Sequence, residues 1–374
     1  MKLWQLIVLV GLGIAYGLIA PGRLAYALGH ATLYVFLPAL LFEAAWNLNY
    51  RAIVRQWVVI AALAGPGVLL TALIVAGALS IVRVPFGPAL LAGAILSATD
   101  PIAVVAVFRR LIVPKTLVTI VECESLFNDA VAVALYRGVL VTLALGSVSA
   151  GAIGLVFIET TAGAAGGVVF GIVLAFAVAR GLRGSEDARI QIAATFLCAY
   201  GAYFAADYLR LSGIFATIAC GIALRYFERS WITLSIAKDV NRFWDIGALL
   251  ANALVFFMVG AALQIGRVTH EPALTVACIV GVAIARIVVA GFLLLGPYPR
   301  EWTDVVRAAG MRGGLSLALA LAIPPSVPYR EAIIDATFAV ALATLAAGSL
   351  TLVPVVRRVA RARSALKLER LTFS

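Results

Sequence analysis

Apolar segments long enough to cross a membrane divide almost the whole chain. About 20 consecutive apolar residues let an α-helix cross the hydrocarbon core of a bilayer, and we count twelve such segments. They cover residues 4–20, 29–46, 56–82, 87–108, 116–142, 151–180, 188–207, 210–226, 246–265, 271–296, 303–323 and 333–356. Inside lipid, only helices and closed barrels satisfy every backbone hydrogen-bonding group. The segments therefore predict an all-α integral membrane protein with about twelve transmembrane helices.

The composition leaves no stretch that would fold as a separate water-soluble domain. Of the 374 residues, 63% are hydrophobic and only 13% are charged, whereas soluble domains have about 25% charged residues. We expect residues 1–374 to form a single membrane domain. The first apolar segment is expected to be retained as a helix and not cleaved as a signal peptide.

The basic residues are distributed unevenly between the two sides of the predicted membrane. Twelve crossings place both termini on the same side. If that side is the cytoplasm, it receives 21 of the 29 Lys and Arg residues, the outer side receives 5, and three stay inside segments. Cytoplasmic loops carry such an excess. We therefore predict a multi-pass protein of the plasma membrane, the inner membrane in a bacterium, with both termini cytoplasmic and no nucleic-acid partner.

Ionisable residues inside the apolar segments are the first candidates for function. A charge near the bilayer centre costs at least about 2.5–3.5 kcal/mol, so such residues are functional or paired. Four of them fall near mid-depth in four different segments: Asp100, Asp129, Arg286 and Arg312. Arg137 and Glu159 lie toward the predicted outer ends of their segments, where we expect an interfacial or structural role.

Two segments are interrupted beside these charges. Pro101 follows Asp100 in "SATDPIAVV", and three glycines surround Arg312 in "GMRGGLSLA". Proline removes a backbone donor and glycine weakens a helix, so both helices should break. The breaks fall in the middle members of two three-segment groups with opposite topology. Paired broken helices in inverted repeats indicate the binding site of a transporter.

Seven stretches follow one another along nearly the whole chain: "FLPALLFEAAWNLN" at 36–49, "GAILSATDPIAVVAVFRR" at 93–110, "ECESLFNDAVAV" at 122–133, "LSGIFATIACGIALR" at 211–225, "FWDIGALLANALVFFMVGAAL" at 243–263, "IARIV" at 284–288 and "GMRGGLSLALAL" at 310–321. In this order they resemble the sodium/proton antiporters of the cation/proton antiporter-1 group, which includes NhaP-type proteins and the animal sodium/proton exchangers.

The resemblance implies an antiporter, not an enzyme, that exchanges Na⁺ for H⁺ by alternating access and contributes to pH homeostasis. Li⁺ or K⁺ remain open as substrates, because ligand types do not fix the size of an ion site. The ions are transported substrates, and no cofactor is expected. The resemblance also implies a homodimer, with interface helices within 4–46 and 151–265 and ion-translocating helices mainly in 56–142 and 271–356.

By the same resemblance, Asp129 is the carboxylate that carries the ion. A membrane interior disfavours a bare carboxylate charge, so the group holds either a proton or a hard cation that prefers oxygen ligands. Further Na⁺ ligands are expected from Ser125, one turn earlier on the same helix face, and from the Thr99 carbonyl freed by the break. Asn128 has no titratable group, which favours electroneutral one-for-one exchange.

The remaining charges are expected to support this site. Glu124 is expected to form a structural ion pair with Arg286, as in relatives. Asp100 either offsets the positive helix ends at the break or joins the ion site through water. Arg312 either balances the dipoles of its own broken helix or neighbours Asp100. Glu122 lies nearer the cytoplasm and is expected to line an acidic entrance that attracts cations.

Three other functions remain as alternatives. The first is a K⁺/H⁺ antiporter of the same fold, and the second is a channel or a non-transporting membrane sensor. The third is an intramembrane enzyme that uses Ser125 or the carboxylates. An enzyme of that kind would need a His or Lys at mid-depth, or a pair of catalytic Asp residues, and the apolar segments contain no such His or Lys.

Overall fold

The computed structural model describes residues 3–19, 32–100, 102–108, 111, 113–144, 150–183, 185, 187–228, 234–262 and 271–372, and every regular element in these ranges is a helix. In chain order the elements are α1 (Leu3–Ile19), η1 (Thr32–Phe36), α3 (Leu37–Asn47), α4 (Tyr50–Ile81), α5 (Phe86–Ser97), α6 (Ile102–Phe108), α7 (Lys115–Ala144), α8 (Ala150–Gly181), α9 (Ala188–Tyr208), α10 (Gly213–Glu228), α11 (Leu234–Ala262), α12 (Pro272–Ala290), η2 (Gly291–Leu295), α13 (Arg300–Ala308), α14 (Gly314–Leu321) and α15 (Arg330–Thr372).

The all-helical prediction is confirmed, and each predicted apolar segment coincides with one helix or with two consecutive short ones. Within the described ranges, six helices are long and apolar enough to cross a membrane alone: α4, α7, α8, α11, α12 with η2, and α15. Both predicted breaks are present. One separates α5 from α6 and the other separates α13 from α14, while Pro101 itself lies outside the described residues.

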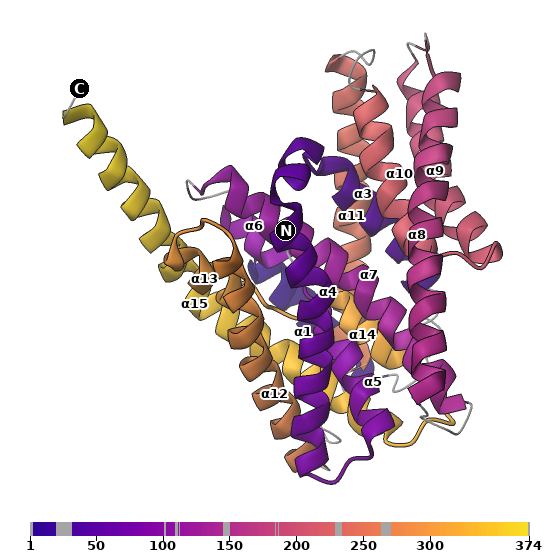
Figure 1. The fold of residues 1–374 in the computed structure, drawn as a ribbon, viewed down its shortest axis with the longest axis vertical. Helices are drawn as coiled ribbons and strands as arrows, with labels where there is room; N and C mark the ends of the chain where they lie inside the picture. The colour runs from indigo at the N-terminus through magenta and orange to yellow at the C-terminus, as the bar shows by residue number, and fades with distance from the viewer. Residues whose placement is uncertain are drawn as a thin grey trace.

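The helices pack as two groups that meet along a limited boundary. We call α4–α7 together with α12–α15 the crossing bundle, because it contains both broken helices. The flanking bundle consists of α1, η1, α3 and α8–α11. In Figure 1, α8, α9 and α10 stand on one side and α12, α13 and α15 on the other, with α7 and α14 between them. Contacts between the bundles come mainly from α7 with α8, α3 with α7, and α11 or η1 with α14.

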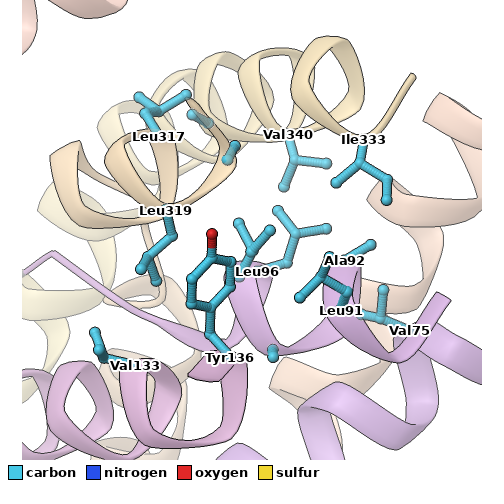
Figure 2. Packing of buried hydrophobic residues seen from close by; sticks show 14 of the residues in the cluster. Val75, Leu91, Ala92, Leu96, Val133, Tyr136, Leu317, Leu319, Ile333 and Val340 are labelled. Atoms are coloured by element: carbon cyan, nitrogen blue, oxygen red, sulfur yellow. The ribbon is translucent and has the colours of Figure 1, made fainter. Parts of the chain in front are cut away.

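The half of the crossing bundle toward the predicted outer side is filled by apolar side chains. Figure 2 shows Leu96 of α5, Val133 and Tyr136 of α7, Leu319 of α14 and Val340 of α15 gathered together. None of these is more than 5% exposed. The same cluster continues into the flanking bundle through Leu41, Tyr203, Ile214 and Val255. Among the described residues, these side chains thus form one continuous apolar cluster that spans both bundles on that side.

Candidate functional site

The two helix breaks lie against each other and satisfy each other's backbone groups. The Asp100 N–H donates to the Met311 carbonyl at 2.9 Å, and the Ser316 hydroxyl of α14 donates to the Ala98 carbonyl at 3.3 Å. Gly313 lies so close to the Asp100 carboxylate that any side chain there would clash. Because Gly313 is also the residue before α14, Asp100 lies at the positive N-terminal end of that helix.

Arg312 occupies the opposite kind of helix end. Its side chain is 2% exposed and donates to the Leu96 carbonyl at the end of α5 and to the Gly310 carbonyl just past α13, both at 2.7 Å. Its backbone N–H donates to the Thr344 hydroxyl of α15 at 3.0 Å. The guanidinium thus neutralises two negative C-terminal helix ends, which is the first of the two roles expected from the sequence.

Polar side chains of α7 face the break between α5 and α6. The Thr99 hydroxyl donates to the Ser125 hydroxyl at 3.2 Å and accepts from the Asn128 amide, also at 3.2 Å. The same amide reaches a Glu124 oxygen at 3.4 Å. All four side chains are buried. The structure thus brings Thr99, Ser125 and Asn128 together as predicted, and it joins them through the Thr99 hydroxyl, whereas the sequence drew attention only to the carbonyl.

Asp129 completes this group and differs from the other buried charges. The backbone N–H of Thr99 hydrogen-bonds its carboxylate, and the Asp100 carboxylate lies nearby. Its Oδ1 atom is buried without a hydrogen-bond partner. In the part of the chain that the structure describes, no basic side chain forms an ion pair with it. The residue as a whole is partly exposed, although this oxygen itself is buried.

Glu124, on the same helix, is paired. Arg286 of α12 donates to both of its carboxylate oxygens, with Nη2 at 3.3 Å from Oε2. Arg286 also donates to the Val306 carbonyl of α13. Glu124 is 1% exposed and Arg286 is 9% exposed. Gly310 has no side chain where Arg286 passes, and any Cβ there would clash with the guanidinium stem. The pair predicted from the sequence therefore joins three helices.

Two further acids considered in the sequence are not fully buried. Glu122 of α7 is partly exposed. Glu159 of α8 is exposed, in agreement with an interfacial role. Two residues that we did not single out, Ser316 and Thr344, hydrogen-bond the breaks. In the sequence, each of them is only a hydroxyl residue in an apolar helix. Such residues are common there because their hydroxyls often hydrogen-bond the backbone of their own helix.

The sequence matches a known protein family over most of its length. The family described as "Sodium/hydrogen exchanger, transmembrane" matches residues 3–358. The low-affinity Na⁺/H⁺ antiporter NhaS1 of Synechocystis is 32% identical over 360 residues, which is 92% of this chain and 67% of that protein. The Na⁺/H⁺ antiporter NhaH of Halobacillus dabanensis is 30% identical over 334 residues, covering 87% of this chain and 82% of the relative.

The fold also matches a solved structure. The sodium proton antiporter MjNhaP1 from Methanocaldococcus jannaschii, determined at pH 8, superposes with a TM-score of 0.82. The match covers 95% of this chain and 92% of that one at 20% sequence identity. At this identity the likeness establishes the arrangement of the helices.

The buried ion pair makes a direct prediction for stability. Glu124→Gln should lower the free energy of unfolding by about 3–5 kcal/mol, because it leaves Arg286 charged and buried without a counter-ion. The measurement is the thermal unfolding midpoint of the detergent-purified protein. The double change Glu124→Leu with Arg286→Met, which removes both charges, should recover most of the loss. An unchanged midpoint for Glu124→Gln would show that the pair contributes nothing to stability.

Proposed function

Because the chain belongs to the sodium/hydrogen exchanger family, we propose that it is a monovalent cation/proton antiporter that exchanges Na⁺ for H⁺ across a membrane. The observation that carries this proposal is Asp129, a carboxylate with an unpartnered buried oxygen in a partly exposed position at the helix crossing. The relatives named as Na⁺/H⁺ antiporters, which match most of the chain, support the same conclusion.

The chemistry of the site follows from competition for one carboxylate. A carboxylate held in a low-dielectric position binds a proton or a cation to offset its charge. Na⁺ is a hard cation and prefers oxygen ligands. The backbone of Thr99 hydrogen-bonds Asp129 and its hydroxyl bonds the Ser125 hydroxyl, and these two hydroxyls are the proposed further ligands. Bound Na⁺ removes the reason for Asp129 to hold a proton, and a bound proton removes the charge that attracts Na⁺. The two substrates therefore exclude each other.

The other buried acids are less suited to this role. Arg286 is already the counter-ion of Glu124, so protonation of Glu124 would leave the Arg286 charge uncompensated. Asp100 is packed against Gly313 at the start of α14, where the helix dipole favours its ionised form. Asp129 differs from Glu124 and Asp100. Among the described residues, neither a basic side chain nor a helix end compensates its charge.

We propose a one-for-one, electroneutral exchange. Asn128 lies beside Asp129 and has no titratable group, so one carboxylate cycles. The Asn128 amide also donates to Thr99 and to Glu124, and an Asp at this position would lose both hydrogen bonds and repel Glu124. The environment of residue 128 is thus suited to an amide, which supports a single exchangeable charge at the site.

We further propose that the crossing bundle carries Asp129 and moves against the flanking bundle to give alternating access. The limited boundary between the two groups of helices supports this division, and the flanking bundle is the proposed homodimer interface. The excess of Lys and Arg at the predicted inner ends supports cytoplasmic termini in a plasma membrane.

Asp129 provides the first test of the proposed exchange. Reconstituted wild-type protein should dissipate an imposed pH gradient when Na⁺ is added, and Asp129→Asn should abolish this because an amide cannot exchange a proton. Parallel additions of Li⁺ and K⁺ define the ion choice, and a K⁺-only response would favour the K⁺/H⁺ alternative. Glu159→Gln, which alters an exposed acid outside the site, should behave as wild type. Exchange that persists in Asp129→Asn would refute the site assignment.

Stoichiometry is tested by charge movement. Proteoliposomes that show Na⁺-driven proton flux should give no net current on a solid-supported membrane, because one positive charge crosses in each direction. The flux should also be insensitive to a valinomycin-imposed potential. A current proportional to the flux would contradict one-for-one exchange and leave the Asp129 assignment intact.

The hydroxyl ligands predict a change in apparent affinity. Thr99→Val should raise the KM for Na⁺ about tenfold, because it removes an oxygen from the site and one hydrogen bond from each of Ser125 and Asn128. Thr142→Val is the matched control on α7, since Thr142 is also buried and bonds only to the Val139 carbonyl of its own helix. Equal KM values for the two variants would exclude Thr99 from the site.

A further inference from the structure

One ion pair joins the two bundles at the predicted outer side. Arg137 Nη1 of α7, in the crossing bundle, lies 2.9 Å from Asp207 Oδ1 of α9, in the flanking bundle. The Tyr203 hydroxyl of α9 also interacts with the Arg137 guanidinium. Arg137 therefore does more than extend toward the membrane surface, which was the role expected from the sequence. It connects two groups of helices that otherwise share few contacts.

The position of Asp207 makes this contact specific. Asp207 is the second-last residue of α9 (Ala188–Tyr208), where the negative end of the helix dipole disfavours another negative charge. A basic partner is needed to offset that cost, and it comes from the other bundle. Three other ion pairs in the described part of the chain differ, because Glu124–Arg286, Asp304–Arg307 and Glu331–Arg330 each lie within the crossing bundle.

The Arg137–Asp207 pair lies beside the apolar cluster that fills the predicted outer half of the crossing bundle. Tyr136, the residue before Arg137, is 5% exposed within that cluster, and Val133, one turn from Asp129, is 4% exposed. Tyr203, which contacts Arg137, belongs to the same cluster and is 1% exposed. Separating the two bundles at this end would part Arg137 from Asp207 and from Tyr203.

We propose that Arg137 and Asp207 are positioning residues that latch the two bundles together at the predicted outer side and so oppose the opening of a path from that side to Asp129. This inference rests on the alternating access of the proposed function. The latch has to be weak enough to open in every cycle. Its two side chains are 47% and 37% exposed, and an ion pair of that exposure shifts an equilibrium by about two- to fivefold.

The latch is tested by the accessibility of a reporter cysteine in the closed cluster. Val133→Cys is introduced into the full chain, and an impermeant maleimide is applied to the outer face of right-side-out vesicles. Asp207→Asn should raise the labelling rate about two- to fivefold, because the closed state loses its cross-bundle pair. Arg137→Gln should do the same. The exchanged pair, Arg137→Asp with Asp207→Arg, should return the rate to that of the parent.

Asp304→Asn is the matched control, since the Asp304–Arg307 pair is similarly exposed, at 53% and 44%, but lies within α13. Its labelling rate should stay at the parent value. The chain without Val133→Cys gives the background from the native cysteines, of which the structure shows four, all buried. Parent-like labelling of both Asp207→Asn and Arg137→Gln would refute the latch, and so would an equal rise in Asp304→Asn.

The same vesicles separate this inference from the proposed function. If the wild type dissipates a pH gradient with Na⁺ but the labelling rates do not differ, the antiporter assignment stands and the latch is wrong. If no monovalent cation drives proton flux in the wild type, the proposed function fails. Labelling that still depends on Asp207 would then show a gating contact in a protein of another function.

Discussion

The crossing of two broken helices at membrane depth is the constraint on which the rest of the structure depends. A break frees carbonyl and N–H groups that lipid cannot satisfy. Here each break supplies partners for the other, through Asp100 with Met311 and Ser316 with Ala98. The remaining helix dipoles are offset by charges of opposite sign, with Arg312 at the negative ends of α5 and α13 and Asp100 at the positive start of α14. Without the break there would be no free backbone beside Asp129.

The same crossing explains why the glycines are needed beside the charges. A Cβ at Gly310 would clash with the Arg286 side chain, and a Cβ at Gly313 would clash with the Asp100 carboxylate. A methyl group at either position would displace a charged side chain, which costs more than the loss of helix propensity that a glycine brings. The glycines around Arg312 therefore make room for the neighbouring charged side chains, in addition to weakening the helix.

Much of this arrangement could be predicted from the sequence because it is written in local patterns. Segment length predicted the helices, and proline and glycine predicted the two breaks. Charge inside apolar segments singled out Asp100, Asp129, Arg286 and Arg312, while the pairing of Glu124 with Arg286 came from the family resemblance. The Thr99 hydroxyl and the partner of Arg137 could not be predicted in the same way. A hydroxyl that bonds across helices looks the same in sequence as one that bonds to its own turn, and Asp207 lies at a helix end where an acid is unremarkable. Contacts between distant helices have no periodicity to reveal them.

The distribution of compensating charge decides which acid is able to work as a carrier. Glu124 is fixed by Arg286, and that pair also ties α7 to α12 and α13, so protonation of Glu124 would loosen three helices at once. Asp129 touches the break through Thr99 and holds no helix in place by an ion pair in the described structure. Protonation of Asp129 would therefore break no ion pair between helices in the described structure. A transport carboxylate has to satisfy both conditions, burial enough to demand a counter-charge and independence from the contacts that hold the helices together. Residue 129 meets both conditions, whereas residue 124 meets only the first.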